Sequence, residues 1–215
     1  MKKFTKVLAV LLAVAVFATA FAACSKNGGT SSKVKVIDIA LSDEEYAFGV
    51  DKNQPELKQQ VNDFVAEIKS NGKLDEICNK YFADGTPEGI TSATQDPSKD
   101  QLVVATNAEF APFEYKQGDQ FFGIDMEIAN LLAQKLNKEL VIVDMAFDAV
   151  LLSVQQGKAD IGMAGLTVTE ERAQQVDFSD SYYSASQKLI VKEGDTTFDN
   201  CKTKEDVDAI LKGFD

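Results

Sequence analysis

The feature that most constrains the fold is an alternation, from Leu102 onward, of short apolar runs with stretches of helical periodicity. A short continuous apolar run suits a strand that is buried on both faces, whereas apolar residues three or four positions apart form one face of a helix. Strands that alternate with helices indicate an α/β fold with a parallel-type sheet. We therefore expect a mixed, mostly parallel sheet flanked by helices. The expected strands are 102–106, 140–143, 160–164 and 188–191, and the expected helices are 124–136, 150–154 and 170–175.

The front of the mature chain has its own pattern of two strands followed by two helices. Residues 34–41 and 45–50 are the strand candidates. Pro55 suits the first position of a helix, where a missing N–H costs nothing, and Gly72 ends that helix. A short second helix is expected over 74–81. The apolar face of the first helix consists of Leu57, Val61, Phe64, Val65 and Ile68.

Two further segments have clear local signals. The stretch 83–100 contains two prolines and two glycines among Ser, Thr and Asp residues, which is typical of a linker. Residues 203–211 begin with a Thr-x-x-Asp pattern. Because that pattern caps helix N-termini, a helix is expected there.

Composition and charge exclude several classes of function. The 215 residues are 45% hydrophobic, as in an ordinary globular protein, and they allow one good domain or two small ones. A formal net charge of −12 disfavours nucleic acid and a bare anionic membrane as partners, because both would repel the protein. The absence of histidine removes His-based acid–base catalysis, His-activated nucleophiles and the commonest zinc ligand. We expect no catalytic residue, no metal and no cofactor.

The first residues are typical of a secretory targeting segment rather than of folded structure. Lys2, Lys3 and Lys6 form a basic region, and the apolar stretch 7–18 is too short to span a membrane comfortably. A cysteine follows small residues in Ala-Ala-Cys, which resembles the lipobox of bacterial lipoproteins. That resemblance implies that Cys24 becomes a lipidated amino terminus, followed by a flexible tether. The alternative is a plain secretory signal that is cleaved nearby.

Three phrases between Leu102 and Asp180 occur in close succession: ATNAEFAPFEY, GIDMEIANLLAQKL and GMAGLTVTEERAQQVDFSD. Together they resemble the first lobe of bacterial extracellular solute-binding proteins of family 3, the polar amino acid receptors of ABC importers. Residues 36–83, with YAFGVDKNQPELKQQVNDFVAEIKSNGKLDEICNKYF, resemble the carboxyl-terminal end of the same family. The chain is therefore similar to one lobe in permuted order, with the second lobe missing. The implied fold is a single lobe of the periplasmic-binding-protein-like type II class.

This resemblance implies a division of the chain in which a linker brings the front segment to the lobe that it completes. The alternative is a fragment or a collapsed tandem, in which the front segment ends one copy and the rest begins a second. The expected divisions are a signal peptide at 1–23, a lipidated tether at 24–35, the lobe-completing segment at 36–83, a linker at 84–100, the lobe core at 101–192, and the start of the crossover to an absent second lobe at 193–215.

A free amino acid offers a carboxylate, an ammonium group and a side chain. The carboxylate is best bound by the two-pronged guanidinium of an arginine together with backbone N–H groups. Arg172 is the only arginine in the chain. The resemblance implies that Arg172 binds the ligand carboxylate, and that the backbone of Gly165 and Thr167 and the Thr167 hydroxyl add hydrogen bonds. The alternative is a surface arginine beside Glu170 and Glu171.

Two phenylalanines follow expected strands at the edge where α/β sheets bind ligands. The resemblance implies that Phe110 and Phe147 sandwich the aliphatic part of the ligand. The alternative for either ring is packing, which is the role that we expect for Phe113. Asn107 offers a neutral amide to a polar ligand side chain and does not strongly favour a cationic one. Three carboxylates at helix starts or strand edges are assigned no site role: Asp125, Asp148 and Asp160.

The function implied by the resemblance is capture without chemistry. We expect a lipid-anchored, extracytoplasmic receptor component of an ABC importer that binds a free polar amino acid and engages a permease. With one lobe, binding by the chain alone should be weak or absent. The alternatives are a truncated or degenerate remnant that does not bind and, less favoured, an enzyme on the same fold.

Overall fold

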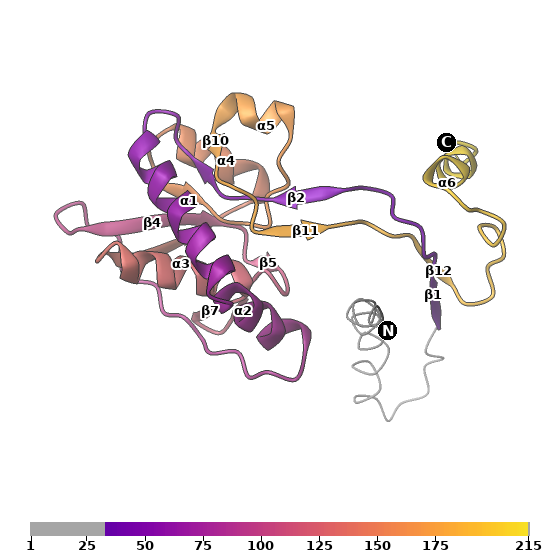
Figure 1. Ribbon diagram of the computed structural model, residues 1–215, viewed down its shortest axis with the longest axis horizontal. Helices are drawn as coiled ribbons and strands as arrows, with labels where there is room; N and C mark the ends of the chain where they lie inside the picture. The colour runs from indigo at the N-terminus through magenta and orange to yellow at the C-terminus, as the bar shows by residue number, and fades with distance from the viewer. Residues whose placement is uncertain (1–32, 215) are drawn as a thin grey trace, which may run out of the picture.

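A five-stranded mixed sheet organises the main body of the protein in the computed structural model, which describes residues 33–214 (Figure 1). Strand β4 runs parallel to both of its neighbours, β8 and β9, whereas β3 runs antiparallel to β9 and β10. The expected α/β fold with a mixed sheet and flanking helices is confirmed. In sheet order the strands are β10 (Asp177–Phe178), β3 (Gly49–Val50), β9 (Ile161–Gly162), β4 (Gln101–Thr106) and β8 (Glu139–Asp144).

Helices cover both faces of this sheet because strand β4 is apolar on both sides. Leu102 and Val104 of β4 belong to the larger core, whereas Val103 and Ala105 pack with the smaller one. Successive residues of a strand point to opposite faces, so these two cores lie on opposite sides of the sheet. The first three helices pack on the larger core and α4 packs on the smaller one. The helices are α1 (Pro55–Ser70), α2 (Lys73–Phe82), α3 (Ile124–Lys135), α4 (Phe147–Gln155), α5 (Glu170–Gln175) and α6 (Lys204–Leu211).

The front segment of the chain is part of this body. Strand β3 lies between β9 and β10 in the sheet. The buried face of α1, with Val61 and Phe64, shares its core with Ile128 of α3. Phe48 stacks on Tyr182 with ring centroids 4.4 Å apart. The sheet and the larger core therefore depend on residues that precede the linker.

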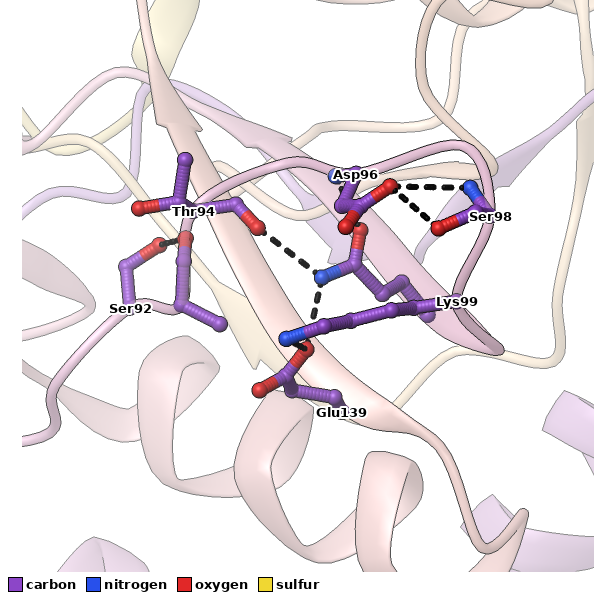
Figure 2. A network of polar contacts seen from close by, with 8 residues as sticks. Ser92, Thr94, Asp96, Ser98, Lys99 and Glu139 are labelled. Carbon is purple, nitrogen blue, oxygen red and sulfur yellow. Dashed lines mark hydrogen bonds and ion pairs between the residues drawn. The ribbon is translucent and has the colours of Figure 1, made fainter.

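The linker before β4 crosses the open edge of β8 and is fixed there by polar contacts (Figure 2). The Ala93 N–H donates to the Leu140 carbonyl at 2.9 Å. The Gln101 amide lies at the centre of the contacts: its oxygen accepts from the Asp96 N–H at 2.7 Å, and its nitrogen donates to the Thr94 carbonyl at 2.9 Å. An edge strand covered in this way cannot pair with another chain.

A small second cluster lies at the far end of a two-stranded ribbon (Figure 1). The ribbon consists of β2 (Glu44–Tyr46) and β11 (Tyr183–Ala185), which pair antiparallel. Beyond it, β1 (Val34–Val36) pairs with β12 (Ile190–Lys192), and α6 adds Val207 to a minor core. As expected, α6 begins with a capping box between Thr203 and Asp206.

Several elements differ from the sequence-based expectations. The expected strand 34–41 is limited to β1, which lies partly inside the expected tether, and 45–50 divides into β2 and β3 because each half pairs with different strands. A three-stranded sheet in the ATNAEFAPFEY region was not expected; it consists of β5 (Glu109–Phe110), β6 (Glu114–Gln117) and β7 (Gln120–Phe122).

The expected signal peptide and the lipidated Cys24 lie outside the described residues. Within the part of the chain that the structure describes, no helix has the length and apolar character needed to cross a membrane.

Replacing Gln101 with alanine should lower the free energy of unfolding by about 1–3 kcal/mol, because the Asp96 N–H and the Thr94 carbonyl lose their hydrogen bonds, each worth about 0.5–1.5 kcal/mol. The matched control is Gln120→Ala, which removes an exposed amide with one longer bond, 3.3 Å, to the Gly89 carbonyl. The control should cost about 0.5 kcal/mol or less. Urea unfolding measures both, and equal losses would contradict a special role for Gln101.

Candidate functional site

A cleft of about 450 Å³ lies at the carboxyl ends of the parallel strands. Asn107 directly follows β4, and Phe147 and Gly165 come shortly after β8 and β9. This is the edge at which α/β sheets commonly bind ligands. The six residues expected from the sequence to contact a ligand all line this one cleft: Asn107, Phe110, Phe147, Gly165, Thr167 and Arg172.

The Arg172 guanidinium is fixed from two sides. Its Nη1 atom donates to the Thr167 carbonyl at 2.9 Å, and its central carbon lies 5.1 Å from the centroid of the Phe147 ring. Helix α5, which carries Arg172, is capped by the Thr169 side chain. Among the described residues no carboxylate forms an ion pair with Arg172. The guanidinium therefore has donors left for an anion, which disfavours the alternative of a surface arginine paired with its neighbours.

Two phenyl rings border the cleft and remain partly open to solvent. Phe110 is 42% exposed and Phe147 is 37% exposed, whereas Phe113 is buried. Phe113 stacks on Phe110 with ring centroids 5.6 Å apart, which is the packing role expected for it. An exposed ring supported from behind can contact the aliphatic part of a ligand without rearranging the core.

Gly165 brings the backbone close to the Phe110 ring. Its φ of +51° favours glycine, and an added Cβ would lie 3.0 Å from that ring. The Gly165 N–H, which we expected to be available to a ligand carboxylate, instead donates to Asp125 Oδ2 at 2.9 Å. Asp125 accepts a second hydrogen bond from the Tyr182 hydroxyl. Asp125, to which the sequence assigned no site role, is thus a positioning residue for this loop.

Two polar side chains that were expected to contact a ligand form hydrogen bonds within the protein. Asn107 Nδ2 donates to the Met145 carbonyl at 3.0 Å, so this amide joins two loops and leaves its oxygen for other contacts. The Thr167 hydroxyl donates to Glu44 Oε2 at 3.2 Å. Both residues therefore shape the cleft as well as lining it.

Sequence reasoning missed three acidic residues that line the cleft: Glu44, Glu109 and Glu114. Of the three, Glu44 and Glu114 are at least partly buried. Burial alone would raise the pKa of Glu44, but hydrogen bonds from Ser42, Gln187 and Thr167 bring it below its usual value. Burial, and next the charge of Asp125, raise the pKa of Glu114 far above its usual value. No local pattern identifies either residue, because their places in the cleft arise from strand pairing.

The family profile of the bacterial extracellular solute-binding proteins, family 3, matches residues 102–214, more than half of the chain. The chain belongs to this family. The arginine-binding extracellular protein ArtP of Bacillus subtilis is 37% identical over 105 residues, which cover 49% of this chain and 41% of ArtP. The histidine-binding periplasmic protein of Salmonella typhimurium is 33% identical over 92 residues, covering 42% and 35%.

Among solved structures, the arginine-bound form of domain 1 from TmArgBP is 32% identical, with a TM-score of 0.39. The matched region covers 54% of this chain and 92% of that domain. The chain spans less than half of the length of the two curated relatives.

Glu114→Gln should make the protein more stable than the wild type at alkaline pH. The pKa of Glu114 is higher in the folded than in the unfolded protein. The stability that the Glu114 side chain contributes is therefore full at acid pH, and it is lost as the pH rises above the pKa of this group in the unfolded chain. The loss reaches about 1.4 kcal/mol per pH unit for one carboxyl group, and glutamine avoids it because it cannot ionise.

Urea unfolding at an acid and an alkaline pH measures this difference. Glu109→Gln, which removes an exposed carboxylate at the same cleft, is the control and should follow the wild type. Parallel pH curves for Glu114→Gln and the wild type would contradict the assignment.

Proposed function

We propose that this chain is an extracytoplasmic receptor module that binds a free amino acid for an ABC importer. The observation that carries the proposal is the convergence, in one cleft, of a guanidinium without a carboxylate partner among the described residues and two solvent-accessible phenyl rings. Membership of the solute-binding family supports it. The module works by capture, with no bond made or broken in the ligand.

In the proposed complex each part of the ligand has a place. The free donors of Arg172 take the α-carboxylate, because a guanidinium matches a carboxylate in geometry and charge. The Phe110 and Phe147 rings contact the aliphatic portion. The carboxylates of Glu44 and Glu114 supply negative charge for ammonium or guanidinium groups.

We further propose a cationic amino acid as the preferred ligand. Three acidic residues, Glu44, Glu109 and Glu114, line the cleft against one guanidinium. Relatives in the same family are named for binding arginine and histidine. The neutral amide of Asn107 does not add to this preference, so the preference rests on the carboxylates.

The remaining parts of the proposal concern the setting of the module. Lipidation of Cys24 would anchor it to the outer face of the cell membrane, since two or three acyl chains give stable attachment. A permease would be its protein partner. Because one lobe offers about half of the contacts of a two-lobed receptor, a micromolar affinity of about −8 kcal/mol would fall to about −4 kcal/mol, which is millimolar.

Titration of the protein with the common amino acids, followed by NMR, tests this function. We expect arginine or another cationic amino acid to shift resonances of the cleft residues with a millimolar Kd. Arg172→Lys keeps the charge but loses the two-pronged geometry, so binding should weaken about tenfold or more.

Lys158→Arg, which likewise keeps the positive charge, is the matched control, because this exposed residue lies shortly after α4 and does not line the cleft. It should bind as the wild type does. Unchanged binding by Arg172→Lys, or no binding of any amino acid at high millimolar concentration, would contradict the proposal.

A further inference from the structure

Glu114 is a buried carboxyl group without a partner. Its residue is 0% exposed, and neither carboxyl oxygen has a hydrogen-bond partner among the described residues. Nearly all buried polar atoms in proteins are hydrogen-bonded, so such an exception needs an explanation. Glu114 pairs with Phe110 across the β5–β6 ladder, and directly opposed residues project to the same face. Glu114 therefore lies on the face that carries Phe110 and lines the cleft.

The surroundings of Glu114 supply negative charge and hydroxyl groups. The charge of Asp125 raises the pKa of Glu114, and the charge of Glu114 in turn raises the pKa values of Tyr46 and Tyr182. Arg172 lines the same cleft but forms no ion pair with Glu114 within the described chain. The titratable and charged groups that face Glu114 or share its cleft are Asp125 of α3, Tyr46 and Glu44 of β2, Tyr182 before β11, Glu109 of β5 and Arg172 of α5.

An ionised carboxylate that is buried without a partner is costly, and the group avoids the cost by taking up a proton. Burial and the Asp125 charge act in the same direction on the pKa of Glu114. Before a ligand binds, Glu114 is therefore a neutral carboxylic acid. A positive charge placed in the cleft would reverse this balance, because an opposite charge nearby favours the ionised form.

We propose that Glu114 receives a positively charged nitrogen of the bound amino acid and releases its own proton to solvent as the ligand enters. This inference rests on the proposed function, since its ligand is the free amino acid bound by Arg172. The neutral acid and the ligand cation become a carboxylate–cation pair, and one proton passes to the buffer. No other bond forms or breaks. Binding is then tighter for a cation than for a neutral isostere, and tighter as the pH rises.

Calorimetric titration with L-arginine, in two buffers of different ionisation enthalpy, measures the protons released. We expect about one proton per bound ligand and a Kd that falls about tenfold per pH unit between about pH 6 and pH 8. Glu114→Gln should abolish both effects. Glu56→Gln, which removes an exposed carboxylate of α1 that does not line the cleft, should keep the proton release.

L-citrulline has a neutral side chain of nearly the same shape and distinguishes the two cationic nitrogens of the ligand. If the guanidinium reaches Glu114, arginine releases a proton and citrulline does not. If the α-ammonium group reaches Glu114, both ligands release one. Either result supports the proposal and identifies the nitrogen.

Infrared difference spectra of the wild type provide a second measurement that needs no variant. The carbonyl band of a protonated carboxyl group should disappear when arginine is added. Arginine binding with an unchanged band, without proton release, or with equal release by Glu114→Gln would overturn this inference and leave the proposed function in place. Absence of any amino acid binding would overturn the proposed function, and this inference with it.

Discussion

The cleft depends on one buried carboxylate, Asp125, at the start of α3. It accepts hydrogen bonds from the Gly165 N–H and the Tyr182 hydroxyl, and so joins a helix, the loop after β9 and the segment before β11. That loop continues to Thr167, whose carbonyl accepts from Arg172. Without these two hydrogen bonds the loop would lose its fixed position, because a buried carboxylate stabilises its surroundings only while its lone pairs are satisfied.

The charges of the cleft are arranged in two different ways. Arg172 and Glu44 are fixed by hydrogen bonds within the protein, so both side chains are positioned before any ligand arrives. Glu114 is fixed in place by burial alone and has no such support within the described chain. The site thus combines side chains that are positioned in advance with one, Glu114, whose charge depends on the bound ligand. The net charge of the protein, −12, also attracts cations.

The sequence predicted the elements whose signals are local. The apolar stripe of α1, the capping box of α6 and the alternating strands and helices depend on neighbouring residues only. The resemblance to the family placed Arg172 and the two phenylalanines, and the structure brings them to one cleft. The roles of Asp125 and Glu114 could not be predicted from the sequence, because a charged residue near the start of a helix or strand usually faces water. Only the packing of α3 and the β5–β6 pairing bury them.

The ribbon of β2 and β11 has a consequence for communication across the molecule. Glu44 belongs to β2, and Gln187 comes just after β11; both side chains line the cleft, and they contact each other at 3.4 Å. The same two segments carry the distant pair β1 and β12 and helix α6 (Figure 1). A ligand that displaces either side chain would therefore break a contact between the two segments that connect the main body to the outlying cluster.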